Sequence, residues 1–156
     1  MQTGYNANKF YKNEIKQIEN YADWDLWTNV ELIRWDRHQQ VAEYHPDYYA
    51  EVLRKIAKVL KDTRLKNEFI YYMGDGMFLI ISPQVSDDMY QKLNQEAHVR
   101  LQALDVDIPL MLKVATQRID KTNYKKFDTL DNVMKHLERG LETDIIVEYL
   151  KDDQND

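Results

Sequence analysis

The chain has 156 residues, a formal net charge of -6 and no cysteine. An acidic chain lacks the basic face that general nucleic-acid binding needs, so we expect no nucleic-acid partner. Without cysteine there is no disulfide framework and no thiolate metal site, and no apolar run is long enough to cross a membrane. The length predicts a single domain over residues 1–150 and a frayed acidic tail over 151–156, and we expect a cytoplasmic protein.

The first half of the chain alternates helical and strand patterns. Apolar residues at helical spacing predict a helix over residues 7–22, and residues 29–35 read as a strand. Pro46 favours the start of a second helix, because proline suits the first helical turn. Two apolar runs around a tight Gly-Asp-Gly predict a hairpin, with strands near 67–73 and 76–82.

The second half continues the alternation. A helix is predicted to begin at Asp87 or at the serine before it, and residues 108–119 form a long strand candidate. Residues 130–137 carry the apolar spacing of another helix, which Gly140 would end at a C-cap position. The apolar segment 145–150 fits either a strand or a helix.

This order of elements is typical of an α+β fold. One strand, a crossover helix, a hairpin, a second helix and a last strand give a βαββαβ core, which is a mixed central antiparallel sheet flanked by helices. A fold does not define a function, so the residues at particular positions must carry the functional argument.

The hairpin also carries a family resemblance. Its turn, Met73-Gly74-Asp75-Gly76-Met77, resembles the signature turn of the GGDEF family, the diguanylate cyclases. In that family the turn Gly-Gly-Asp/Glu-Glu-Phe holds substrate and metal. The opening segment 3–10 resembles the family's opening motif, and the likeness covers nearly the whole chain. It implies the palm-like fold of GGDEF domains and nucleotidyl cyclases.

The turn matches the family motif only in part. Gly74 and Asp75 match the second glycine and the acidic residue, which places Asp75 on a metal ligand of the family. The positions that depart from the motif are Met73, Gly76 and Met77. A register shifted by one residue would instead place Phe78 on the phenylalanine and take Asp75 off the acidic position. A plain β-turn also explains this sequence, because Gly and Asp suit turns whatever their chemistry.

The other positions that match family site residues are changed more severely. Arg34 falls on the metal-binding aspartate at the end of the first strand, and Asp36 falls on the second aspartate. A guanidinium has no lone pair and stays protonated, so Arg34 puts positive charge where the family binds a divalent cation. Ala42 falls on the guanine-reading asparagine, Glu51 lies near the second guanine-binding residue, and Leu137 falls on a phosphate-contacting lysine. Phosphoryl transfer between two GTP molecules needs the metal, so the resemblance implies lost chemistry.

A second candidate nucleotide site precedes the hairpin. Arg64 and Asn67 resemble the Arg-x-x-Asp motif that binds cyclic di-GMP as an inhibitor in the family. Arginine can fork onto a guanine or a phosphate, and Asn67 keeps the hydrogen-bonding shape of the aspartate but not its charge. The alternative is a solvated turn before a strand. The remaining candidates for chemistry show no metal-ligand spacing and are expected at the surface: His38, His45, His98 and His136.

Together these observations predict a catalytically inactive GGDEF-like domain with a regulatory or protein-interaction role, in cyclic-di-GMP or exopolysaccharide signalling. The alternatives are a sensor domain that binds a nucleotide, GTP or cyclic di-GMP, and a diguanylate cyclase with residual activity. We expect no cofactor and no metal; Mg²⁺ on Asp75 and Asp36 is the expectation if activity survives. A protein partner or a homodimer is expected, with no membrane association within this chain.

Overall fold

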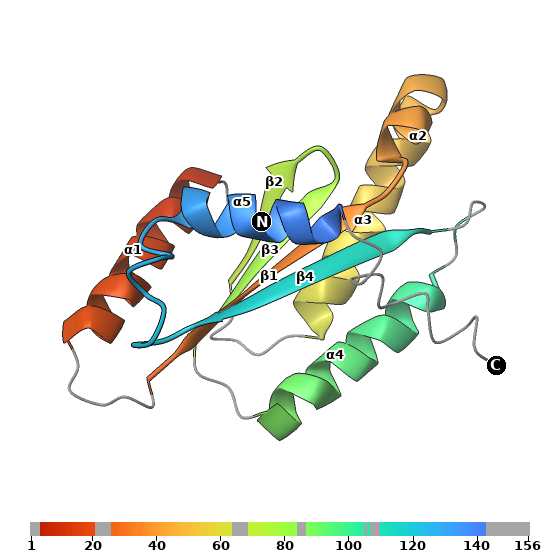
Figure 1. The fold of residues 1–156 in the computed structure, drawn as a ribbon. Coiled ribbons are helices and arrows are strands. Elements are labelled where there is room, and N and C mark those ends of the chain that lie inside the picture. The colour runs from red at the N-terminus through yellow and green to blue at the C-terminus, as the bar shows by residue number, and fades with distance from the viewer. Residues whose placement is uncertain are drawn as a thin grey trace.

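The computed structural model describes residues 4–20, 26–63, 69–83, 87–104, 106 and 110–142. The chain folds as an α+β domain in which helices cover a central sheet (Figure 1). In chain order the elements are α1 (Gly4–Asn20), β1 (Thr28–Trp35), α2 (His38–Tyr44), α3 (Pro46–Asp62), β2 (Phe69–Gly74), β3 (Met77–Pro83), α4 (Asp87–Gln102), β4 (Leu112–Ile119) and α5 (Leu130–Leu141).

The sheet has the strand order β2-β3-β1-β4, and every neighbouring pair is antiparallel. The two strands that the crossover helices join, β1 and β2, are separated by β3. This arrangement confirms the predicted βαββαβ core. It places β1 in the middle of the sheet, where it pairs with β3 on one side and with β4 on the other.

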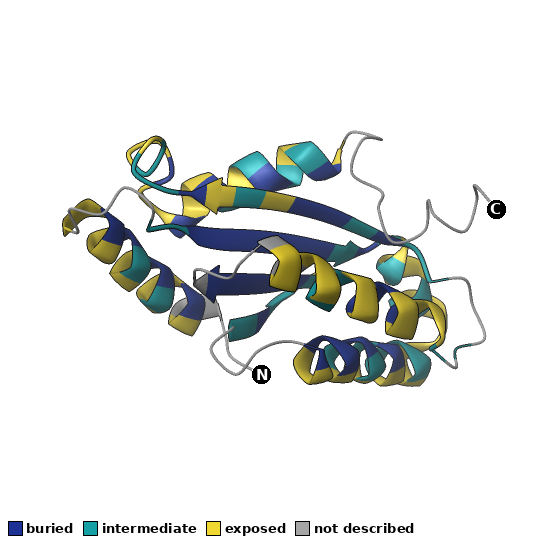
Figure 2. Ribbon diagram, turned by 90° about the horizontal axis from the view of Figure 1, so that it is seen from below, coloured by how far each residue is buried: buried dark blue, intermediate teal, exposed yellow. Residues whose placement is uncertain are grey.

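Two helical layers cover the two faces of the sheet. The faces alternate along β1: Val30 and Leu32 pack with α1 and α5, whereas Ile33 and Trp35 pack with α3 and α4. All four side chains are at most 1% exposed. Figure 2 shows the buried strands between helices that turn their exposed residues outward. Successive side chains of a strand point to opposite faces, so a strand with both faces covered by helices buries apolar side chains on each face.

Specific polar contacts fasten the outer helices. The Tyr11 hydroxyl donates a hydrogen bond to the carbonyl of Phe127 over 2.5 Å, which joins α1 to the segment before α5. At the start of α5, the Thr129 side chain accepts from the backbone N–H of Asn132. This is an N-cap contact, which satisfies one of the free N–H groups of the first helical turn.

Most helix ends agree with the sequence, but α1 begins at Gly4, before the predicted start at residue 7, and α5 ends later than predicted. Pro46 lies in the first turn of α3, as predicted. The predicted C-cap at Gly140 is wrong, because α5 continues to Leu141 and its C-cap is Glu142. Leu141 is fully buried. Burial of this side chain outweighs the modest preference of glycine for ending a helix.

Other differences from the sequence-based elements have a physical cause or lie outside the described residues. The helix α2 was not predicted, and none of its residues is buried, so it has no apolar stripe to reveal it. Strand β4 begins at Leu112, later than the predicted strand. Segment 145–150 and the tail lie outside the described residues. Among the helices of the described part, none is both long enough and apolar enough to cross a bilayer.

Candidate functional site

The ends of three strands bring the candidate site residues together. Arg34, near the end of β1, stands opposite Met77 of β3 and opposite Lys113 of β4. Asp36 follows the strand directly. The backbone pairing therefore collects two cations and a carboxylate at one end of the sheet.

Ion pairs link these groups into one cluster, which we call the cation cluster: Arg34, Asp36, Lys113 and Glu142. One guanidinium nitrogen of Arg34 lies 3.7 Å from Asp36, and the other lies 3.7 Å from Glu142 at the end of α5. The Lys113 ammonium lies 3.8 Å from the second oxygen of Asp36. Arg34 and Lys113 are 22% and 23% exposed, whereas Glu142 is 72% exposed. Asp36 thus forms ion pairs with two largely buried cations at once.

This donor set does not fit a divalent metal ion. Mg²⁺ needs oxygen ligands in near-octahedral order, and a guanidinium offers no lone pair. Asp36 is also already neutralised by two cations. Within the described ranges, no group of three or more His, Cys, Asp or Glu side chains is placed to hold a metal. Arg34 and Asp36, which the sequence resemblance aligns with the family's two aspartates, form an ion pair with each other.

The hairpin turn is confirmed, and its backbone explains its sequence. Gly74, Asp75 and Gly76 have φ angles of 86°, 52° and 70°, all in the left-handed region. Glycine adopts this region freely and aspartate does so more readily than most residues. The backbone N–H of Trp35 donates to the carbonyl of Gly76 over 2.8 Å, which holds the turn against the end of β1. Asp75 itself is exposed.

His38 fills the space beside this turn. A Cβ on Gly76 would stand 2.8 Å from Cγ of the His38 ring. The Nδ1 atom lies 2.8 Å from the Trp35 carbonyl, which only accepts, so Nδ1 carries the proton. The other ring nitrogen, Nε2, is buried without a hydrogen-bond partner. The sequence resemblance aligns Gly76 with a glutamate of the family motif, and His38 occupies the room that any side chain at this position would need.

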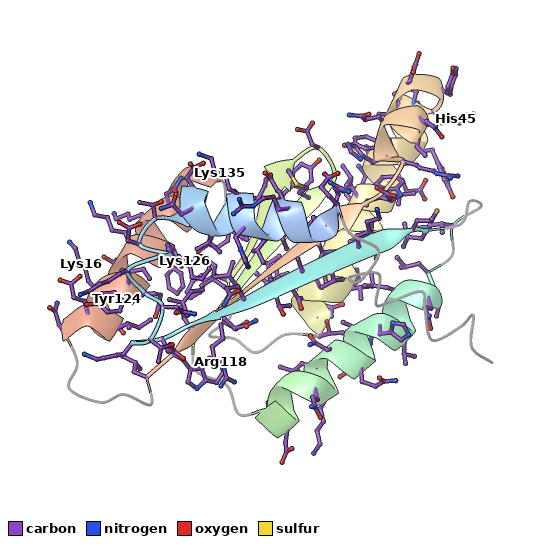
Figure 3. The ribbon with its side chains drawn as sticks, in the orientation of Figure 1. Lys16, His45, Arg118, Tyr124, Lys126 and Lys135 are labelled. Atoms are coloured by element: carbon purple, nitrogen blue, oxygen red, sulfur yellow. The ribbon has the colours of Figure 1, made fainter. Side chains whose placement is uncertain are left out.

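The expectation that the histidines lie at the surface is therefore wrong in part. His98 is only 7% exposed, and His136 is half-buried with its ring 5.2 Å from that of Phe127. Burial lowers the pKa of His136, and the nearby Lys126 and Arg139 lower it further. His45 is exposed as expected, at the junction of α2 and α3 (Figure 3). The hairpin turn packs against His38 and the Phe127 ring packs against His136, and residue spacing reveals neither contact.

Aromatic side chains also pack beside the hairpin turn. The rings of Trp35 and Tyr49 stack with centroids 5.4 Å apart. The Tyr49 hydroxyl lies 3.2 Å from that of Tyr72, which also accepts from the backbone N–H of Gly76 over 3.3 Å. Burial, together with the hydrogen bond to Tyr72, raises the pKa of Tyr49. The region beside the turn is thus filled by the protein's own side chains.

The remaining predicted site residues do not join the cation cluster in the described structure. Glu51 is 54% exposed on α3 and pairs with Lys55 over 3.5 Å. Ala42 lies in α2 and offers no polar group. Leu137 is 1% exposed within the core between the sheet and α5, so it cannot contact a phosphate. Arg64 and Asn67 lie outside the described residues.

Two members of the cation cluster were missed in the sequence. Lys113 is paired to Arg34 by the β1–β4 register, which residue spacing alone does not specify. Glu142 reaches the cluster because α5 continues past Gly140. Neither position carries a motif, so only the three-dimensional arrangement identifies them.

Comparisons with known proteins agree on the architecture. No family model matches the sequence, and no curated protein matches it. Solved structures do match. The GGDEF domain of YfiN (TpbB) from Pseudomonas aeruginosa superposes with a TM-score of 0.74 at 11% identity, covering 91% of this chain and 88% of that one.

Two further solved structures show the same likeness. The active GGEEF domain of a diguanylate cyclase from Vibrio cholerae gives a TM-score of 0.69 at 12% identity, with 88% of each chain covered. The diguanylate cyclase SiaD of Pseudomonas aeruginosa, solved with its activator SiaC, gives 0.61 at 12% identity, covering 85% of this chain and 55% of that one. Since each superposition covers 85% or more of this chain, the chain has the fold of GGDEF domains.

Proposed function

We propose that this chain is a catalytically inactive GGDEF-fold domain that acts by regulation or protein contact. The observation that carries the proposal is the ion pairing at the end of β1, where Arg34 and Lys113 share Asp36. A diguanylate cyclase needs a divalent cation on the transferring phosphates. Two fixed positive charges would repel that cation, and the one carboxylate beside them is already paired.

The side chains packed beside the hairpin turn support the same conclusion. His38 packs against Gly76, and the Tyr49–Tyr72 pair closes the neighbouring space. A substrate phosphate approaching the turn would have to displace these side chains. Ala42 and the buried Leu137 offer no polar group for guanine or phosphate recognition.

A regulatory role requires a surface that another protein can contact, and we propose α2 as that surface. None of its residues is buried, and Tyr44 at its end is 71% exposed. Exposed tyrosine is a frequent anchor in protein interfaces. The solved complex of SiaD with its activator is a precedent for protein control of this fold. We place the role in cytoplasmic cyclic-di-GMP signalling, with a homodimer or another protein as partner.

The test of inactivity is a product assay. The protein is incubated with GTP and either Mg²⁺ or Mn²⁺, and the nucleotides are separated by chromatography. We expect no cyclic di-GMP above a no-protein control, while an active cyclase run in parallel makes product. Product that disappears in the Asp75→Ala variant would overturn the proposal and establish residual activity.

The test of the contact surface is the oligomeric state measured by light scattering, together with pull-down from cells that produce cyclic di-GMP. We expect Tyr44→Ser to abolish self-association or partner capture, and Tyr48→Phe on α3 to leave both unchanged. Full retention of the partner in the Tyr44→Ser protein would show that α2 is not the surface.

A further inference from the structure

We propose that Arg34 and Lys113 form a metal-independent binding site for a small phosphate-bearing anion, and that Glu142 is its internal competitor. The proposal deepens the proposed function, because both rest on cations at the position of the family's metal. The two remain separable: inactivity concerns product formation, whereas this inference concerns anion binding in the absence of metal.

The first observation is that both cations have unused hydrogen-bond donors. Arg34 contacts Asp36 and Glu142 at 3.7 Å, and Lys113 contacts Asp36 at 3.8 Å. These distances exceed the usual range of about 2.7–3.2 Å for a hydrogen bond. Polar groups this deeply placed are normally hydrogen-bonded to protein or to water. Among the described residues, the sealed and unpartnered side-chain atoms are His38 Nε2 and Asn94 Oδ1, so the donors of both cations still reach solvent.

The second observation is the charge balance of the cation cluster. Arg34 and Lys113 stand directly opposite each other across the β1–β4 pair, and like charges in that relation repel. Asp36 neutralises only one of the two. The inner part of the cluster therefore keeps one net positive charge, which an anion from outside would neutralise.

The third observation identifies where that anion would sit. Glu142 is 72% exposed, yet its carboxylate lies beside the guanidinium nitrogen of Arg34 that does not face Asp36. This carboxylate stands in for an external anion. Because it is held by a single long contact on an exposed side chain, its attraction is weak and it can be displaced.

The geometry favours a phosphate group over a simple carboxylate. A phosphate carries more oxygens and more charge than a carboxylate, so it can accept from the guanidinium nitrogen of Arg34 that does not face Asp36 and from the Lys113 ammonium together. A shallow pocket of about 330 Å³, lined by Lys135, Glu138, Arg139 and Glu142, adjoins the cluster through Glu142. Figure 3 shows Lys135 on the outward side of α5. This pocket has room for the rest of a small phosphorylated molecule.

The experiment is calorimetric titration of the full chain with pyrophosphate after treatment with EDTA. We expect saturable binding without metal, and weaker binding when Mg²⁺ is added, because Mg²⁺ competes for the pyrophosphate. Arg34→Gln and Lys113→Gln should each lower the affinity about tenfold or more, as loss of a charge-assisted hydrogen bond does. Glu142→Gln should raise it severalfold. Lys58→Gln, which breaks an exposed ion pair with Asp62 at 2.9 Å, is the matched control and should change nothing.

The outcomes separate the two proposals. Absence of saturable binding by the wild type, or equal affinities in wild type, Arg34→Gln and Glu142→Gln, would overturn the anion site and leave the inactivity proposal standing. Binding that requires Mg²⁺ would overturn the anion site in favour of a metal site. Thermal melts check folding, and if Arg34→Gln does not fold, the opposite changes expected for Lys113→Gln and the exposed Glu142→Gln decide the matter.

Discussion

The ring of His38 lies so close to Gly76 that a Cβ on the glycine would stand 2.8 Å from Cγ of the ring. Real Cβ atoms essentially never approach that closely, so a side chain at position 76 and the imidazole exclude each other. The position is also left-handed, with φ of 70°. Glycine is thus required here for two independent reasons, neither of which involves nucleotide chemistry.

We therefore expect Gly76→Ala to destabilise the protein by about 2–4 kcal/mol, combining about 1–2 kcal/mol of backbone strain with overpacking. Gly74→Ala is the matched control. Its φ is 86°, but a Cβ there meets nothing within 4 Å, so only the strain remains. Urea unfolding measures both. His38→Ala in the Gly76→Ala background should recover the packing part, and equal losses in the two glycine variants would show that His38 is not the obstacle.

The buried tyrosines predict a loss of stability at high pH. Burial raises the pKa of Tyr71 to about 12, with the Glu14 carboxylate adding to the shift. Burial and the nearby Asp128 raise the pKa of Tyr11 as well. In the unfolded chain both titrate near 10. Above pH 10 the unfolded state loses these protons first, so the contribution is complete below pH 10 and declines as the pH rises toward 12.

The slope should be about 1.4 kcal/mol per pH unit for each buried tyrosine. The free energy of unfolding in urea, measured from pH 9 to pH 11.5, checks this. Tyr71→Phe should flatten the decline, whereas Tyr44→Phe should leave it unchanged, because Tyr44 is 71% exposed. A decline that is identical in all three proteins would show that Tyr71 titrates alike in the folded and unfolded states.

Replacing Arg34 tests the electrostatic argument directly. Arg34→Asp removes one cation from the cluster and places a second carboxylate beside Asp36, which supplies the oxygen ligands that divalent metals prefer. We expect Mn²⁺ affinity to rise at least tenfold over the wild type, seen as paramagnetic broadening of amide signals around residues 34–36. Arg100→Asp, which changes an exposed ion pair with Glu96 on α4, is the control. Equal Mn²⁺ broadening in the two variants would refute a local effect of Arg34.

The arrangement of the sheet was predictable, because hydrophobic patterns report burial and the glycine turn reports backbone geometry. The strand of residues 29–35 and the hairpin fall close to β1, β2 and β3 for that reason. The surface helix α2 was not predictable, since none of its residues is fully buried and it has no apolar stripe. The helix end predicted from Gly140 was wrong, because the helix continues to Leu141, whose side chain is buried in the core.

The sequence predicted only those members of the candidate site that lie in or directly after the first strand. Arg34 and Asp36 were identified from their positions at the end of the first strand. Their contact follows from their closeness in the chain. Lys113 required the β1–β4 register, and Glu142 required the length of α5. His38 was wrongly expected at the surface, because the hairpin turn, which is distant in sequence, packs against its ring. Contacts between distant segments leave no periodic trace in a sequence.

The central place of β1 has a consequence for how the domain opens. Its side chains Val30 and Leu32 belong to one core and Ile33 and Trp35 to the other, and its backbone is paired on both sides. Neither helical layer can separate from the sheet and expose β1 completely while the other remains in place. The amide hydrogens of β1 should therefore exchange with deuterium only through global unfolding, whereas those of the edge strand β2 exchange through smaller local openings.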